Sequence, residues 1–254
     1  MSISGQNLSI VIVTLKSEKI IHECIKSINQ DLPIIVVENS NNETFKNDLE
    51  SKYKNLKCIL SKSNLGMGAA NNIGIKSSST DYVLILNPDV TCDHNFFSNI
   101  LEVTNEVEDF SIIGCQYSKD KVFMPAGFFN RAKNKEFSKR FKNKEIKNLS
   151  KVEWVTGCSI LINLKQFVEK KIFDENFFLY FEEFDLCKSL SMINKKVYTS
   201  DKLKVHHLGF QSSLSEDHEE NLKKINMKNW HYMWSSFYFY KKNYNFFYAI
   251  KSMY

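Results

Sequence analysis

Acidic side chains at two places in this sequence have the types and spacing that suit metal binding and proton transfer. Asp89 closes the apolar stretch "YVLILNPD", residues 82–89, two positions after Asn87. Because a buried carboxylate without a partner is costly, we expect Asp89 to face a cation rather than to be buried. Mg²⁺ and Mn²⁺ take oxygen ligands and are commonly shared between carboxylates and the phosphates of a substrate. Asn87 adds an oxygen but no second charge.

The second acidic cluster follows the aromatic run "FFLYF" and contains Glu182, Glu183 and Asp185. Acids in the first turn of a helix are stabilised by about 0.3 to 1 kcal/mol each, which is a purely structural role. A carboxylate in a partly apolar setting also suits general-base catalysis, because its proton affinity is raised there. The residues alone leave both roles open, and they leave His206 and His207 equally open between a structural role and a ligand role.

Other polar residues follow the remaining apolar stretches of the first half. Thr14 follows the first, Glu38 and Asn39 follow the second, and Asn64 and Gly66 follow the third. Each one alone is typical of a turn or a helix cap. Their shared placement at strand ends indicates a binding site, in which a carboxylate or amide contacts a base or ribose and glycine allows close backbone approach.

The elements that must position these residues alternate along the first half. Apolar runs predict strands over 8–13, 33–38, 57–60 and 82–87, and helical spacing predicts helices over 20–28, 45–53 and 69–76. This alternation favours a doubly wound, mostly parallel α/β sheet, whose ligands bind at the carboxyl ends of the strands.

The second half has a different pattern. We expect a helix over 95–107, a strand over 111–114, a mobile loop or excursion over the basic segment 131–151, a strand over 152–163 and a helix near 184–193. The predicted organisation is one domain over 1–220, made of halves 1–110 and 111–220, followed by a helical segment over 221–254.

Composition and charge bear on where the protein works and on what it binds. The six cysteines form no C-x-x-C pair, which predicts reduced thiols in a cytoplasmic protein, and no secretory leader or membrane-spanning run is expected. The segment 221–254 holds twelve aromatic residues and six lysines but no acid. This composition fits either an aromatic helix packed on the domain or an interfacial element at the inner face of an anionic membrane. Nucleic-acid binding is the least favoured alternative, because no recognisable binding motif accompanies the basic segments.

The ordered set "SIVIVT", "IIVVEN", "NLGMGAANNIGI", "DYVLILNPDV", "WVTGCSILI", "FDENFFLYFEEFDLC" and "HLGFQS" resembles the family 2 glycosyltransferases with a GT-A fold. The resemblance spans about residues 8–212 and is strongest to the rhamnosyltransferase-like members that build bacterial surface polysaccharides. It implies inverting transfer of a sugar, with rhamnose one candidate, from a nucleoside diphosphate donor to a hydroxyl of a glycan or lipid-linked acceptor, with Mg²⁺ or Mn²⁺.

The resemblance also implies roles for individual residues. The nucleotide sugar is expected against eight residues, namely Thr14, Glu38, Asn39, Asn64, Gly66, Asn71, Asn87 and Asp89. It places Glu183 at the catalytic base with Glu182 and Asp185 beside it, Trp154 and Gly157 near the acceptor, and Asp89 with His207 at the metal.

Two departures from the family pattern bear on the substrate and on the activity. Ala70 occupies the position of an arginine that UDP-sugar users often carry, which favours a dTDP-sugar over a UDP-sugar. Asn87 and Glu38 replace the usual aspartates, so a nucleotide-sugar-binding module with weakened catalysis is the alternative function.

Overall fold

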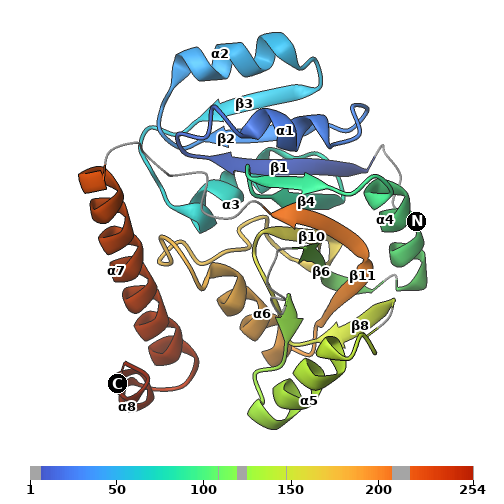
Figure 1. Ribbon diagram of the computed structural model, residues 1–254, viewed down its shortest axis with the longest axis vertical. Helices are drawn as coiled ribbons and strands as arrows, with labels where there is room; N and C mark the ends of the chain where they lie inside the picture. The colour runs from blue at the N-terminus through green and yellow to red at the C-terminus, as the bar shows by residue number, and fades with distance from the viewer. Residues whose placement is uncertain (1–6, 108, 119–124, 147, 208–217, 254) are drawn as a thin grey trace.

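The computed structural model describes residues 7–107, 109–118, 125–146, 148–207 and 218–253. Within these residues a nine-stranded sheet has the order β3-β2-β1-β4-β10-β6-β11-β5, with β8 paired to β11. Helices lie against this sheet, and the long helix α7 stands apart at the left of the view in Figure 1. The predicted α/β sheet with an aromatic C-terminal helical segment is confirmed.

The first half of the chain builds the parallel part of the sheet. Strands β1 (Leu8–Thr14), β2 (Ile34–Glu38), β3 (Leu56–Leu60) and β4 (Tyr82–Leu86) run in the same direction, as predicted. Every residue of β1, β2 and β4 is buried, because helices cover both faces of a parallel sheet. The connecting helices are α1 (Ile21–Lys26), α2 (Glu43–Lys52) and α3 (Met67–Ser77).

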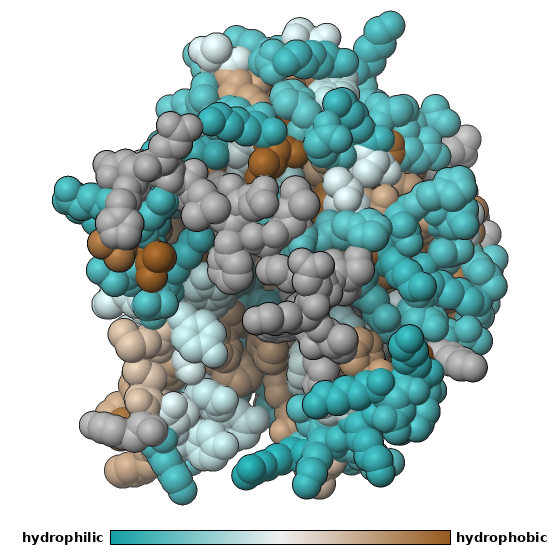
Figure 2. All heavy atoms as spheres, viewed as in Figure 1, coloured by the Kyte–Doolittle hydropathy of each residue, from teal (hydrophilic) through white to brown (hydrophobic). Residues whose placement is uncertain are grey.

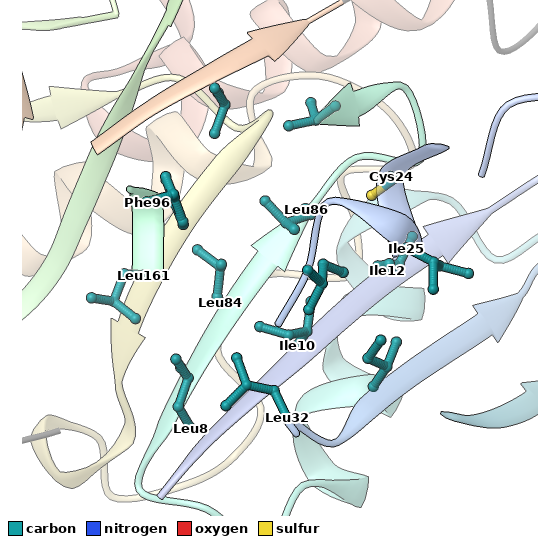
Figure 3. Packing of buried hydrophobic residues seen from close by; sticks show 14 of the residues in the cluster. Leu8, Ile10, Ile12, Cys24, Ile25, Leu32, Leu84, Leu86, Phe96 and Leu161 are labelled. Atoms are coloured by element: carbon teal, nitrogen blue, oxygen red, sulfur yellow. The ribbon is translucent and has the colours of Figure 1, made fainter. Parts of the chain in front are cut away.

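Two apolar layers hold the helices on the sheet. Leu8, Ile10 and Ile12 alternate onto one face with Leu84 and Leu86, as Figure 3 shows, and the intervening residues supply the other face. Helix α3 lies very close to the second face, because a Cβ at Gly74 would come within 2.4 Å of Val11 Cγ1. A side chain at Gly74 would therefore push α3, and the loop that starts it, away from the sheet.

The second half adds antiparallel and crossover strands to the same sheet. Strand β10 (Ser159–Asn163) lies between β4 and β6 (Phe110–Ser118) and is antiparallel to both. Strand β11 (Lys196–His207) pairs in parallel with β6 and antiparallel with β5 (Val90–Cys92) and β8 (Leu149–Val152). The two predicted halves thus contribute to one continuous sheet. Helix α4 (Phe96–Glu106) packs beside β11.

The prediction of a mobile loop over 131–151 is wrong. Residues Arg131–Lys142 form helix α5, and the Asn130 side chain caps it by accepting hydrogen bonds from the N–H groups of its first turn. Phe137 is buried and lies edge-on against Phe128 at 5.6 Å between ring centroids. One cap and one aromatic anchor therefore order a segment that is poor in aliphatic residues.

The single strand predicted over 152–163 is divided in the structure. Trp154–Val155 forms β9, which pairs with β7 (Ala126–Gly127), and the sheet resumes only at β10. The interruption contains Gly157, which passes beside the Glu183 side chain. Between β9 and β10 the chain therefore lies outside the sheet, beside the acidic cluster.

The C-terminal segment is helical. Helix α7 (His218–Asn243) is followed by α8 (Phe246–Lys251), and the acidic cluster begins α6 (Glu182–Met192), which follows the 3-10 turn η1 (Leu164–Gln166). Among the residues that are described, none of the helices has the length and apolar character needed to cross a membrane.

Candidate active site at the carboxyl edge of the sheet

Parallel pairing brings the predicted strand-end residues to one edge of the sheet. Thr14 is in register with Glu38, and Glu38 with Leu60, so the ends of β1, β2 and β3 are level. Strand β4 pairs in parallel with β1 and ends one residue before Asn87. The polar clusters therefore converge, as the sequence predicts.

Glu38 and Asn39 form hydrogen bonds with the loops at this edge of the sheet. Glu38 is fully buried, and its Oε2 accepts a hydrogen bond from the Asn42 N–H at 2.6 Å. The Asn39 amide donates to Asn64 Oδ1 at 2.9 Å, and its Oδ1 accepts from the Leu65 N–H at 3.0 Å. These side chains shape the loops at the ends of β2 and β3, which is a role in addition to any contact with a nucleotide.

Three predicted binding residues carry buried oxygen atoms without a hydrogen-bond partner among the described residues. They are Thr14 Oγ1, Asn71 Oδ1 and Asn87 Oδ1. Leaving a buried polar atom unpaired costs roughly 1 to 3 kcal/mol, and native proteins accept this cost mainly where a ligand, an ion or water completes the site. Oxygens of this kind could take a hydrogen bond or a coordination bond from a ligand, an ion or water at this edge.

Gly66 fixes the approach of the loop that precedes α3. It is the N-cap residue, its φ is +81°, and a Cβ there would lie 2.2 Å from the carbonyl oxygen of Phe178. That carbonyl accepts the Met67 N–H at 2.9 Å, which joins the start of α3 to the segment before the acidic cluster. A residue with a side chain has no room here.

Asp89 and His207 lie together, but Asp89 is not exposed as expected. Only 4% of its surface is accessible, and its Oδ1 is 3.2 Å from His207 Nε2. The pairing of β5 with β11, which sets Val90 opposite His207, brings the two side chains into contact. Our expectation of an unburied carboxylate was wrong, because the side chain of Asp89 is enclosed where His207 contacts it.

The donor atoms at this point fit a divalent cation that is shared with a substrate. Asp89 and His207 offer an oxygen and a nitrogen, and Asn87 Oδ1 is unpartnered nearby in sequence. Across the part of the chain that the structure describes, no group of three or more His, Cys, Asp and Glu side chains could enclose a metal. Protein donors this few would fit Mg²⁺ or Mn²⁺, which commonly take phosphate and water oxygens as further ligands.

The acidic cluster is positioned by a strained turn. Tyr180 and Phe181 both adopt left-handed backbone conformations, with φ values of +70° and +66°. Such conformations cost non-glycine residues about 1 to 3 kcal/mol each and recur at functional sites. The Phe181 ring is held by Tyr232 and Phe239 of α7, at 5.4 Å in both cases, so α7 helps to maintain the turn.

Burial raises the pKa of the Glu183 carboxyl group. The nearby backbone N–H groups of Glu183, Gly157 and Phe184 oppose this rise only in part. A Cβ on Gly157 would be 3.2 Å from Glu183 Oε1, so the glycine lets the carboxylate lie close to the backbone.

Glu182 is in a less polar environment. Burial, together with the neighbouring charge of Glu183, raises the pKa of Glu182 to about 8. Its Oε2 is buried without a partner among the described residues, and its Cβ is near Gly68 of α3. Burial thus raises the pKa of both neighbouring carboxyl groups, and the charge of Glu183 adds to the rise at Glu182.

Asp185 is separated from the other two acids. It is buried, and its carboxylate binds Lys242 Nζ at 2.7 Å and Asn243 Nδ2 at 2.9 Å, both from α7.

Trp154 stacks on Phe184 with ring centroids 5.0 Å apart, which forms an aromatic surface beside the cluster. Figure 2 shows a hollow between α7–α8 and α5 in the lower half of the molecule.

The sequence did not predict the roles of two residues near the site, Asn72 and Lys242. Asn72 fastens the loop before the acidic cluster, because it bonds the backbone N–H groups of Ile172 and Phe173 and the carbonyl of Phe173. Lys242 bridges Asp174 and Asp185 at 2.7 Å each. The lysines of 221–254 suggested contact with a membrane surface. The tertiary structure shows that one of them, Lys242, instead forms ion pairs with two acidic residues of the protein itself.

Two solved structures have the same architecture as this chain. A chain of GalNAc-T7, whose structure contains UDP, GalNAc and Mn²⁺, superposes with a TM-score of 0.61 at 14% identity, covering 87% of this chain and 47% of that one. TarS residues 1–349 from S. aureus, in complex with UDP, superposes with a TM-score of 0.60 at 14% identity, covering 89% of this chain and 65% of that one. The present chain thus spans about half to two thirds of these chains, and its fold is the GT-A fold.

The sequence comparison specifies the family. Residues 9–199 match the model of "Glycosyl transferase family 2", and the chain belongs to this family of glycosyltransferases. Rhamnosyltransferase WbbL from Escherichia coli (strain K12) is 27% identical over 212 residues, covering 74% of this chain and 78% of that protein. Low-salt glycan biosynthesis hexosyltransferase Agl10 from Haloferax volcanii is 25% identical over 198 residues, covering 71% of this chain and 60% of that protein.

Proposed function

We propose that this glycosyltransferase moves a sugar from a nucleoside diphosphate donor to an acceptor hydroxyl with inversion of configuration. The observation that carries this proposal is the pair of neighbouring glutamates at the start of α6, where the Glu183 carboxyl lies close against the backbone of Gly157. In a single displacement one carboxylate must accept the proton of the attacking hydroxyl, and a carboxyl group whose pKa is raised by burial, as that of Glu183 is, suits this task.

Each side of the site has a role in this reaction. The orphaned oxygens at the strand ends and the backbone near Gly66 bind the nucleotide. Trp154, stacked on Phe184, offers a flat aromatic surface for the acceptor. Asp89 and His207 would hold Mg²⁺ or Mn²⁺, which supplies positive charge for the departing diphosphate when it is bound.

The donor is proposed to be a dTDP-sugar or a UDP-sugar, with rhamnose as the first sugar to test. The likeness to a rhamnosyltransferase supports this choice, and Ala70 favours the dTDP nucleotide. A thermal-shift screen of dTDP- and UDP-sugars, with and without Mn²⁺, should show a rise in Tm for the true donor, because ligands that bind only the folded state stabilise it.

The decisive experiment is transfer with the best donor from that screen and a panel of glycan and lipid-linked acceptors. NMR of the product should show an anomeric configuration opposite to that of the donor. Retention of configuration would exclude Glu183 as the base of a single displacement. Donor binding without hydrolysis or transfer would instead support the alternative, a nucleotide-sugar-binding module.

We further propose that α7 and α8 contact an anionic membrane surface, where a lipid-linked acceptor would be found. Trp230 is 56% exposed, Trp234 47% and Phe247 82%, and exposed lysines on the same segment complement anionic headgroups. Figure 2 shows brown and pale side chains along α7–α8 on this face.

Flotation with phosphatidylglycerol vesicles tests this contact. Replacing Trp230 and Trp234 by serine should reduce bound protein severalfold, because interfacial affinity follows buried apolar area. Val168→Ser is the matched control, since Val168 is an exposed apolar residue outside this segment. Equal flotation of the double variant and the control would refute membrane contact through this face.

A further inference from the structure

Helix α6 carries a half-buried lysine, Lys188, whose contacts are with aromatic rings. Its Nζ lies 5.1 Å from the centroid of the Phe129 ring and 5.2 Å from that of the Tyr244 ring. Among the described residues it has neither a hydrogen-bond acceptor nor an ion-pair partner. An ammonium group has three N–H donors, and a ring face uses them poorly. Lys188 can therefore still bind an anion.

The two rings place Lys188 between the walls of the hollow in Figure 2. Phe129 lies two residues before α5 begins, and Tyr244 directly follows the last residue of α7. The Phe129 N–H donates to Glu153 Oε2 at 2.8 Å, which holds the ring in place. The Lys188 ammonium thus lies where α5, α6 and α7 come together.

One face of α6 leads from the acidic cluster to this lysine. Phe184 and Lys188 are four residues apart, so they share a face of the helix, with Lys188 about 6 Å further along the axis. Phe184 stacks on Trp154, the residue proposed to contact the acceptor. An acceptor that rests on Trp154 with its hydroxyl at Glu183 would therefore extend towards Lys188.

Helix α5 adds positive charge on the other wall of the hollow. It has one acid, Glu136, and six exposed basic residues, which form no ion pairs within the described part of the chain: Arg131, Lys133, Lys135, Lys139, Arg140 and Lys142. Figure 2 shows hydrophilic side chains over α5 and more apolar ones over α7–α8. Cations of one sign beside a hollow raise the local concentration of anionic ligands.

We propose that Lys188 binds a phosphate group of the acceptor substrate, in a subsite that Phe129 and Tyr244 flank. This inference rests on the proposed function, because it concerns the acceptor of the same reaction. Phosphate is the anion that fits best, since the excess positive charge of α5 suits a group with more than one negative charge, and lysine binds phosphate as a point charge. A phosphorylated glycan and a lipid phosphate present the same group to Lys188.

Titration calorimetry with glucose 1-phosphate and farnesyl phosphate tests the subsite and separates these two sources. Mg²⁺ and saturating UDP or dTDP keep the probes out of the proposed donor site. Lys188→Met should weaken the tighter-binding probe about tenfold or more, because a hydrogen bond to a charged group is lost. Lys188→Arg should restore most of the affinity. Methyl glucoside, which lacks the phosphate, should bind wild type and Lys188→Met equally.

Lys76→Met is the matched control, because it removes one exposed lysine from α3, away from α5, α6 and α7. In transfer assays Lys188→Met should raise the KM of a phosphate-bearing acceptor about tenfold and leave kcat within about twofold of wild type. A fall in kcat with unchanged KM would contradict a role in acceptor binding.

Three further results would overturn the inference. If Lys188 only joins α6 to the two rings, Lys188→Met will lower the Tm and leave the affinity for phosphate unchanged. Equal losses of affinity in Lys188→Met and Lys76→Met would indicate a general effect of charge. Failure of the wild-type protein to bind either phosphate probe, while it binds UDP or dTDP, would refute this subsite alone. Failure to bind any nucleoside diphosphate would instead refute the proposed function, and the acceptor subsite with it.

Discussion

Two adjacent glutamates, Glu182 and Glu183, lie in different surroundings. Backbone N–H groups partly oppose the rise in the pKa of Glu183, whereas one oxygen of Glu182 has no partner among the described residues. Burial raises the pKa of both, and the charge of Glu183 adds to the rise at Glu182. A carboxyl group whose pKa is raised has the higher proton affinity that a general base needs.

Replacement of Glu183 by glutamine tests the catalytic base. Turnover should fall by about 10² to 10⁴, the usual contribution of a general base, while donor affinity stays within about twofold of wild type. Rates under saturating donor and titration calorimetry measure the two effects separately. Ser189→Ala, an exposed change on the same helix, should leave both unchanged. Full turnover in Glu183→Gln would remove this residue from the mechanism.

The raised pKa of Glu182 predicts a pH dependence of stability. Between the ordinary glutamate pKa of 4.5 and the folded-state pKa of about 8, the native protein binds more protons at this site than the unfolded chain does. Its contribution is therefore fully present below pH 4.5 and is lost as the pH rises towards 8. Glu182→Gln should flatten this part of the stability profile, measured by urea unfolding at several pH values. An identical slope in wild type and variant would contradict the assignment.

Residue types at the strand ends were predictable, but the partner of each side chain was not. Alternating apolar runs indicate where strands end, so Thr14, Glu38 and Asp89 could be assigned to one edge. The family resemblance placed His207 beside Asp89, and the structure adds that Asp185 is bound by Lys242 and Asn243. These contacts join residues from distant parts of the chain, and periodicity carries no information about them.

At the scale of elements, the segment between Phe173 and Phe181 connects α3, α6 and α7. Its backbone binds the start of α3 through Phe178, and its rings pack on α7. The sequence predicted the flanking helices, but it did not predict that this irregular segment would join them. Irregular backbone follows tertiary contacts rather than local propensity, and two left-handed residues in a row are an example.

Gly66→Ala should destabilise the protein strongly. The new methyl group would meet the Phe178 carbonyl oxygen at 2.2 Å and would also require a left-handed conformation. We expect a loss of at least about 2 kcal/mol in the free energy of unfolding, together with weaker donor binding. Gly68→Ala is the matched control, because its nearest neighbour is a side-chain atom at 3.3 Å. If Gly66→Ala and Gly68→Ala lowered the free energy of unfolding in denaturant equally, the close contact between Gly66 and the Phe178 carbonyl would be contradicted.

Lys242→Met should loosen the contact between α7 and α6. It would leave the buried Asp185 with Asn243 as its remaining partner in α7 and would free Asp174 from its lysine. Because Lys242 is 34% exposed in its side chain, we expect a loss of about 1 to 3 kcal/mol rather than the larger cost of breaking a fully buried pair. Lys241→Met, at the exposed neighbouring position, should change the unfolding free energy by less than about 0.5 kcal/mol. If Lys242→Met and Lys241→Met were equally stable, the ion pairs of Lys242 would not be needed for the stability of the fold.

At the scale of the whole molecule, the alternation of strands and helices was sufficient to predict the fold class. The order of the strands was not predictable, because β10 enters the sheet between β4 and β6 only through long-range pairing. The basic segment was expected to be a loop, since its helix depends on a cap and on one buried ring. Local pattern thus determines which elements form, and tertiary contacts determine where they lie.

The position of β10 also has a consequence for the order in which the chain can fold during synthesis. The free edge of β4 is covered only by Ser159–Asn163, which the ribosome makes long after β4 itself. Until then a fully buried, aliphatic strand presents an open edge, which invites pairing with other chains. Nascent chains stalled before Asn163 has emerged should therefore be protease-sensitive at β4 and depend on chaperones, and protection should appear once β10 is free of the ribosome.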